Sequence, residues 1–487
     1  MEGLVRRFPL ISQIILNNID DKSLINFRKT SRESSNLLDN ERFYWIRIIK
    51  NYSVNFKGFQ ESWKKVITKT PVEFLKNLAF SVHSFFNGVS TRRETQWHPL
   101  FIGAEKGSLS FCKHVVERTG DVNIKIIKNG FTPLALAANE GHLEICAFLI
   151  KYLDDKNPEE IDGWTPLHRA AQQGHLEICK LLLDHIDNKN PGSESGWTPL
   201  HCASSNGHLE IWKALIIHLG NNNPANHNNG WTPFHVAAKK GHLELCELIM
   251  ENIANKDPAS DDGLTPLQLA AEHGHLDICM MIMENLGDKN PGRNNGVTAL
   301  HAAAKNGHLE ICQVIMQNIV NKHPEDISGW TPLHFAAQNG HLEVCETLMK
   351  NLVEKNPWKI DSYTPLHVSA LQGHLEICKL LMENIDNKNP EGYSGKTPLH
   401  YAAIRGHLNV YKQIIQYLDD LNPKDNAGWT PLHLASYHGH FKLCELISER
   451  IEDLNPYTNT GKTPIYFANE KNHRPIVSLL RLAQIKN

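Results

Sequence analysis

The feature that most constrains this chain is a short string that recurs at a fixed spacing. Gly163-Trp164-Thr165-Pro166-Leu167-His168, followed by Gly174-His175-Leu176-Glu177, returns as Gly196-Trp197-Thr198-Pro199-Leu200-His201 after 33 residues. From Thr132 to Thr463 the same threonine recurs in ten steps, of which nine span 33 residues and one, from Thr198 to Thr232, spans 34. Self-similarity at such a period predicts a solenoid of stacked units, each in contact only with its neighbours.

Composition and charge are those of an ordinary soluble protein. The chain of 487 residues is 41% hydrophobic and 21% charged, and its net charge of −3 does not favour nucleic acid. No apolar run reaches the length of about 18 residues expected of a membrane span. The apolar segment near the N-terminus is interrupted by Asn17, Asn18, Asp20 and Asp21, which makes a poor secretory signal. We therefore expect a cytoplasmic protein that is not secreted and binds neither nucleic acid nor membrane.

The cysteines follow the repeat. Nine of the ten stand in one slot, two residues after the Glu of His-Leu-Glu or its equivalent, and Trp212 and Tyr411 fill that slot in other repeats. A position that accepts Cys, Trp or Tyr serves as packing volume, which predicts buried thiols in a reducing compartment. A metal or disulfide ladder is the alternative, but it needs partners at close spacing, and the chain contains no Cys-x-x-Cys.

The string Thr-Pro-Leu-His, then Ala-Ala, then Gly-His-Leu-Glu resembles the ankyrin repeat, and the resemblance covers about residues 97–487. It implies an all-α fold, a solenoid of about twelve helix-turn-helix units joined by short β-hairpin loops. The first unit, at His98-Pro99-Leu100-Phe101, and the last, at Lys471-Asn472-His473, depart from the pattern. Atypical terminal units are expected of such a stack, because each end must face water.

Each part of the repeat has a physical role. The Thr hydroxyl caps the first helix, Pro occupies a position that needs no amide partner, and Gly174 and its equivalents end that helix in a left-handed conformation. After the second helix, the Gly usual in the family is replaced by Ile or Leu, as in Ile186-Asp187-Asn188-Lys189-Asn190-Pro191. Without that Gly, we predict that the second helix continues about one turn further and ends near the Asn-Pro pair.

The first fifty residues carry a different pattern, with apolar residues at helical spacing in three short pieces. They resemble an F-box. The residues that match that family in order are Phe8-Pro9, Ile14, Ile15, Asp20, Ser23-Leu24, Ser31-Arg32, Asp39 and Trp45. The resemblance implies docking to the small adaptor subunit of a Skp-cullin-F-box ubiquitin ligase. The residues that carry over best to that contact are Pro9, Leu10, Ile14, Ile15, Leu24 and Ile25.

These patterns predict three parts: an F-box-like helical segment at 1–50, a helical bridge at 51–96, and the ankyrin solenoid at 97–487. The alternative for the first part is that its helices only cap the solenoid. The bridge can be either a rigid two-helix spacer or a hinge.

Catalytic chemistry is not expected. Most of the 28 histidines stand in the Thr-Pro-Leu-His and Gly-His slots, where repeated use indicates hydrogen bonding in turns and caps. Gly395-Lys396-Thr397 and Gly461-Lys462-Thr463 resemble the end of a P-loop, but Pro390 and Pro456 stand where its first Gly belongs. We predict a non-enzymatic protein without a cofactor or metal.

Variation between repeats indicates where a partner binds. The changing positions are the residue before Thr-Pro and the pair before Gly-His, which we call the variable positions; in ankyrin proteins they line a concave binding surface. Residues predicted to contact a target protein are Trp164, Gln172, Gln173, Trp197, Trp231, Lys239, Lys240, Trp330, Tyr363 and Trp429. Exposed Trp side chains are typical of binding hot spots. Alternatively, each Trp only packs on the neighbouring hairpin.

Taken together, these features predict a monomeric adaptor that docks to a ubiquitin ligase through residues 1–50 and binds an unknown target protein through the repeats. The combination is similar to proteins of large DNA viruses, which implies action in the cytoplasm or nucleus of a host. The alternative is an ankyrin scaffold that binds or sequesters a protein without ubiquitination.

Overall fold

The computed structural model describes residues 98–125, 130–352, 355–357 and 363–486. The predicted F-box-like segment and bridge, with Pro9, Leu10, Ile14, Ile15, Leu24 and Ile25, lie outside the described residues. The chain divides into two compact units, residues 1–228 and 229–487. The boundary falls inside the one step of the sequence that spans 34 residues, between Thr198 and Thr232.

The described residues form twelve pairs of helices, as the repeat predicts. The first helices of the pairs are α8 (Pro99–Lys106), α10 (Pro133–Glu140), α12 (Pro166–Gln173), α14 (Pro199–Asn206), α16 (Pro233–Lys240), α18 (Pro266–His273), α20 (Ala299–Asn306), α22 (Pro332–Asn339), α24 (Pro365–Gln372), α26 (Pro398–Arg405), α28 (Pro431–His438) and α30 (Pro464–Glu470). The second helices are α9 (Leu109–Thr119), α11 (Leu143–Ile150), α13 (Leu176–His185), α15 (Leu209–Ile216), α17 (Leu243–Asn252), α19 (Leu276–Glu284), α21 (Leu309–Asn318), α23 (Leu342–Lys350), α25 (Leu375–Asn384), α27 (Leu408–Ile414, continued by the 3-10 turn η1, Ile415–Tyr417), α29 (Phe441–Ser448) and α31 (Arg474–Lys486).

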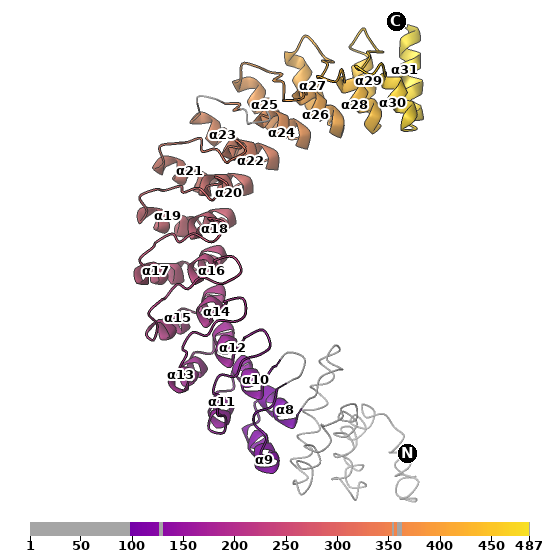
Figure 1. Cartoon of the computed structure of the whole chain (residues 1–487). Coiled ribbons are helices and arrows are strands. Elements are labelled where there is room, and N and C mark those ends of the chain that lie inside the picture. Colours follow the sequence, from indigo (N-terminus) through magenta and orange to yellow (C-terminus); the bar gives the residue numbers. More distant parts are fainter. Residues whose placement is uncertain (1–97, 126–129, 353–354, 358–362, 487) are drawn as a thin grey trace, which may run out of the picture. The chain divides into compact units, whose positions relative to one another are not determined.

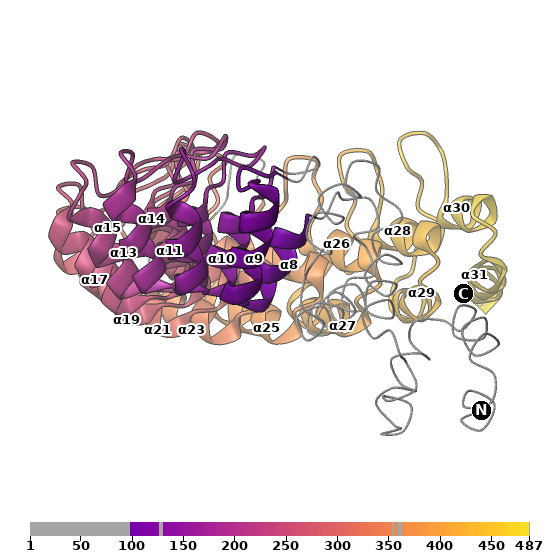
Figure 2. The same cartoon turned by 90° about the horizontal axis from the view of Figure 1, so that it is seen from below.

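Within each unit the helices form two rows. In the first unit, α8, α10, α12 and α14 form one row and α9, α11, α13 and α15 the other (Figure 1). In the second unit, the even-numbered helices from α16 to α30 form one row and the odd-numbered helices from α17 to α31 form the other (Figure 1). Figure 2 shows that the connectors of each unit project to one side of the helices. The core lies between the rows, where Leu167, Ala170 and Cys179 are fully buried.

The connectors make tight turns, and no strand occurs in the described part of the chain. In the turn before α12, the amide of Glu160 donates to the carbonyl of Trp164 at 2.7 Å, and the amide of Gly163 donates back to the carbonyl of Glu160. Neighbouring turns are joined by single backbone bonds, such as that from the Glu194 amide to the Asp162 carbonyl at 3.0 Å. The predicted β-hairpin loops are therefore hydrogen-bonded turns that are too short to form strands.

The prediction of a longer second helix is wrong. Helix α13 ends at His185, and Ile186 takes an extended backbone conformation with φ −114° and ψ 151°. Ile385 does the same after α25, and both side chains are more than nine-tenths buried. Leaving the helix at this residue turns its side chain into the core, so burial of apolar surface ends the helix without a left-handed Gly. The helix that does end at such a Gly, α9 before Gly120, is longer, with 11 residues.

In several repeats, a lysine three residues after this Ile or Leu helps to close the helix. The Lys156 ammonium donates to the carbonyl of Ile150 at 2.6 Å, and that of Lys256 donates to the carbonyl of Ile253 at 2.8 Å. A cation at this end satisfies carbonyls that have no partner in the helix and favours the negative end of the helix dipole. The next residue then ties the connector to the following repeat, because Asn157 Oδ1 accepts from the amide of Leu167 at 3.1 Å.

Candidate functional site

In the repeats that carry it, the Thr-Pro-Leu-His string builds the start of the first helix from two side chains. In α12 the backbone amide of Thr165 donates to His168 Nδ1 at 3.1 Å, and the Thr165 hydroxyl lies 2.9 Å from the same nitrogen. Since Nδ1 accepts from an amide, the proton of the neutral ring is on Nε2. That nitrogen lies 3.0 Å from the carbonyl of Trp197 in the next repeat, to which it donates. The histidine therefore joins one repeat to the next.

Burial keeps these histidines neutral. Desolvation lowers the pKa of His168 to about 4, although its bond to the Trp197 carbonyl opposes the shift. Desolvation has the same effect on His235, His301, His367, His400 and His433. A buried neutral ring with both nitrogens bonded is poorly placed to act as a general base or a metal ligand.

The second histidine of each repeat makes the link in the opposite direction. His175 Nε2 lies 3.0 Å from the carbonyl of Asn139 in the preceding repeat. Its ring also covers Gly141, which ends α10 with φ 81°, and a Cβ at that Gly would lie 2.6 Å from His175 Cε1. Gly is thus required there both by the left-handed backbone and by the close approach of the ring.

All ten cysteines are buried free thiols, as predicted for the nine in the repeat slot, and Cys202 in α14 is the tenth. Desolvation raises the pKa of Cys146, Cys312 and Cys345 to about 12, so these thiols are not ionised at neutral pH. Trp212, which fills the same slot in α15, is fully buried. The described residues contain no group of three or more His, Cys, Asp or Glu that could hold a metal ion.

The aromatic residues before Thr-Pro lie half-buried, rather than exposed as the hot-spot interpretation supposed. Each ring lies against the histidine of its own repeat. The centroid distances are 5.4 Å for Trp164–His168, 4.8 Å for Trp197–His201, 6.0 Å for Trp231–His235, 5.4 Å for Trp330–His334, 5.8 Å for Tyr363–His367 and 5.9 Å for Trp429–His433. The rings thus pack on their own repeat and remain partly accessible, and both interpretations retain a physical basis.

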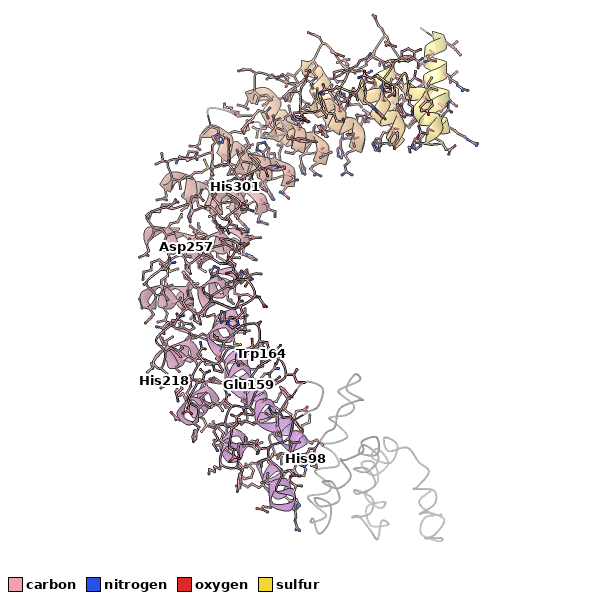
Figure 3. All side chains as sticks on the ribbon, in the orientation of Figure 1. His98, Glu159, Trp164, His218, Asp257 and His301 are labelled. Atoms are coloured by element: carbon pink, nitrogen blue, oxygen red, sulfur yellow. The ribbon has the colours of Figure 1, made fainter. Side chains whose placement is uncertain are left out.

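Trp164 shows how such a ring is held. Figure 3 places Trp164 toward the first-helix row of its unit and His218 toward the second-helix row. The Arg169 guanidinium lies over the Trp164 ring at 4.6 Å and forms a bidentate pair with Glu160, with bonds of 2.9 and 2.6 Å. The Glu160 carboxyl is buried, and desolvation raises its pKa against the opposing effect of Arg169. Sequence reasoning missed this pair because Arg169 and Glu160 stand outside the repeated string.

The polar residues predicted to bind a target lie at the ends of the first helices. In α12, Gln172 is half-buried and Gln173 is exposed, with its amide donating to Asn139 Oδ1 at 3.3 Å. In α16 of the second unit, Lys239 is half-buried with its ammonium 5.1 Å from the Trp231 ring centroid, and Lys240 is exposed. These positions are accessible, in contrast to the buried histidines of the same helices.

A sequence model of the ankyrin repeat family, spanning three copies of the repeat, matches residues 71–160, 152–226, 217–292, 281–359, 350–425 and 410–486. These matches cover most of the chain, so the protein belongs to the ankyrin repeat family. The first match begins at residue 71, within the segment predicted as a bridge. No curated protein matches the chain.

Family membership gives a role in protein–protein interaction, because ankyrin repeats bind protein partners and are generally non-catalytic scaffolds. Among the described residues, no helix is long and apolar enough to cross a membrane.

Proposed function

We propose that this protein is the substrate-recognition subunit of a Skp-cullin-F-box type ubiquitin ligase, with the repeats binding a target protein. The observation that carries the ligase half is the ordered match of residues 1–50 to the F-box pattern, from Phe8-Pro9 through Ser23-Leu24 to Trp45. Support for the target-binding half is that accessible variable positions stand on a scaffold whose repeated histidines are already hydrogen-bonded to neighbouring repeats. The proposal includes action in the cytoplasm or nucleus of a host cell, which the resemblance to proteins of large DNA viruses implies.

The accessible side chains proposed to contact the target are, in the first unit, Trp164, Gln172, Gln173 and Trp197, and in the second unit Trp231, Lys239, Lys240, Trp330, Tyr363 and Trp429. Aromatic rings held in place by a neighbouring His or a cation lose little freedom when a partner covers them. An interface built on them therefore retains more of its contact energy than one built on freely rotating side chains.

The test is affinity capture of the full chain from cells, probed for the ligase adaptor and the cullin. A variant carrying Pro9→Ala and Leu24→Asp should lose both, while a Gln173→Ala variant should retain them. If the intact chain captures neither subunit, the ligase proposal is wrong. Capture of a target by an intact chain that lacks both ligase subunits would instead favour a scaffold that sequesters its partner without ubiquitination.

A further inference from the structure

The variable positions change character near the C-terminal end of the second unit. The residue two places before Gly-His is Lys239, Glu272, Lys305 and Gln338 in α16 to α22, and then becomes apolar as Leu371, Ile404 and Tyr437 in α24, α26 and α28. All three apolar side chains are half-buried and so partly accessible. They occupy one slot on three neighbouring helices, which makes them an apolar stripe that crosses the repeats.

The backbone of this stripe is held by hydrogen bonds from histidines of the following repeats. His407 Nε2 bonds the carbonyl of Leu371 at 3.1 Å, His440 Nε2 that of Ile404 at 3.0 Å, and His473 Nε2 that of Tyr437 at 3.1 Å. Each stripe residue is therefore fixed to the next repeat by a bond of its own main chain. A partner that covers the stripe meets a surface already in its bound arrangement, which reduces the entropy lost on binding.

Aromatic rings extend the stripe at its C-terminal end. Trp429 stacks on Phe467 with centroids 4.2 Å apart, and Tyr437 meets the edges of both rings at 5.9 and 6.0 Å. Tyr466, the next ring along α30, is 45% exposed. Rings packed in this way offer a firm apolar surface to a partner.

The charges beside the stripe are mostly positive. Arg405 and Lys471 are exposed at the ends of α26 and α30, and the Lys462 ammonium lies 4.6 Å from the Tyr466 ring centroid. Lys396 is neutralised by Asp425 at 2.9 Å, and Glu470 approaches Lys471 at 3.9 Å. Desolvation lowers the pKa of His438, and the charge of Arg405 beside it lowers that pKa further. The flank of the stripe thus favours negative charge on whatever covers it.

We propose that the stripe of Leu371, Ile404 and Tyr437, with its Arg405, Lys462 and Lys471 flank, binds an acidic amphipathic helix of the target protein. Packed helices lie about 8–10 Å apart, so the stripe presents an apolar side chain at about that interval. In an α-helix that crosses the repeats, residues seven positions apart lie on the same face, about 10.5 Å apart along the helix axis. Apolar residues at that spacing with acidic neighbours match both the stripe and its flank, in the helix-in-groove mode of recognition. This inference rests on the proposed role of the repeats in target binding.

The probe is a synthetic 21-residue helical peptide with leucines at two positions of each heptad and glutamates at most of the others. A second peptide replaces the glutamates with lysines. Binding to the full chain is followed by the anisotropy of a labelled peptide at low and physiological salt. The glutamate peptide should bind at least about tenfold more tightly than the lysine peptide, and salt should reduce the difference.

Two variants locate the site. Ile404→Ser should weaken the glutamate peptide by about tenfold or more, since it removes a partly accessible apolar contact. Arg405→Glu should weaken it by about tenfold and reduce the preference over the lysine peptide. The matched control is Lys412→Glu, which makes the same change of charge at an exposed position of α27 in the same repeat and should leave binding unchanged. Circular dichroism checks that each variant is folded.

Equal binding of the two peptides, an equal effect of Lys412→Glu and Arg405→Glu, or no binding at all would overturn the inference. A different result separates it from the proposed function. If the full chain captures a target whose binding survives both Ile404→Ser and Arg405→Glu but is lost on changing Trp164, the repeats bind a target and the stripe does not. If the glutamate peptide binds as expected but no target is captured, the helix-binding role of the stripe is supported and the proposed function is wrong.

Discussion

The buried histidines and the variable positions lie on the same first helices, yet they differ in how much they change between repeats. In the repeats from Thr165 to Thr430 the histidine slot has a single replacement, Gln268, and its amide reproduces the same bonds by donating to the carbonyl of Val297 at 3.1 Å. In the variable slots, residues range from Lys239 through Gln338 to Leu371. Positions with two fixed partners accept few side chains, whereas an accessible position is limited only by what binds it. The first set should therefore control stability and the second binding.

The largest effect expected from the buried set is loss of stability in acid. In the second unit His235, His301, His367, His400 and His433 have pKa values of about 4, below the unfolded value of 6.5. The unfolded chain thus binds more protons between these values, so stability is complete above pH 6.5 and falls toward pH 4. Each of these histidines lowers the free energy of unfolding by up to about 2 kcal/mol at pH 5.

Urea unfolding at pH 7.5, 6 and 5, followed by circular dichroism, measures this loss. His301→Gln provides the matched control, because Gln occupies the same slot at Gln268 and does not titrate. His301→Gln should reduce the loss of stability between pH 7.5 and pH 5 by the contribution of one histidine. A urea midpoint that does not change between pH 7.5 and 5 would refute the assignment.

The next largest effect should come from Trp212→Ala in the first unit. Trp212 is fully buried, so its removal leaves a large cavity and should cost about 3–5 kcal/mol in the free energy of unfolding. Trp197→Ala is the comparison, because that ring is half-buried at a variable position of the same unit. It should cost much less stability and reduce target binding instead. Equal losses of stability would show that the Trp before Thr-Pro is a packing residue, as the alternative interpretation holds.

A smaller loss is expected from Gly340→Ala. Gly340 has φ 83°, and a Cβ there would lie 2.7 Å from His374 Cε1, so the variant combines backbone strain with displacement of that ring. His374 would then lose its bond to the carbonyl of Gln338, for a total of about 2–3 kcal/mol. Gly287→Ala is the control, since a Cβ at Gly287 meets nothing within 4 Å. Thermal unfolding of both variants decides whether the Gly-His contact stabilises the stack.

Sequence reasoning recovered the parts of the fold that depend on local chemistry. The first helices begin after Thr165 and its equivalents and end at left-handed Gly174 and its equivalents, because caps and turns are decided within a few residues. The end of the second helix was mispredicted. Burial of Ile186 and the hydrogen bond from Lys156 to the carbonyl of Ile150 depend on packing in the folded chain, which the sequence alone does not show. The accessibility of Trp164 was overestimated for the same reason, because Arg169 covers it only in the folded state.

A gain of stability, rather than a loss, is expected from Asp257→Asn. Asp257 occupies the connector slot held by Asn157, Asn190 and Asn290 in other repeats, and its Oδ1 accepts from the amide of Leu267 at 3.0 Å. Figure 3 shows its place in the second unit. Burial raises the pKa of its carboxyl from 3.8 to about 7, so between these values the folded chain keeps a proton that the unfolded chain releases. Stability therefore falls as pH rises through this range, the opposite sign to the histidines.

An Asn at this position keeps the same acceptor and does not titrate. Asp257→Asn should stabilise the second unit by up to about 4 kcal/mol at pH 8 and by less than about 1 kcal/mol at pH 4. The reciprocal change, Asn290→Asp, should destabilise the same unit at pH 8, because it buries a second carboxylate in the equivalent slot. Urea midpoints of both variants at the two pH values make the comparison. If neither midpoint changes at pH 8, the carboxylate at this slot is hydrated in the folded chain. The connector slot would then resemble the variable positions, which accept many side chains, rather than the buried histidines.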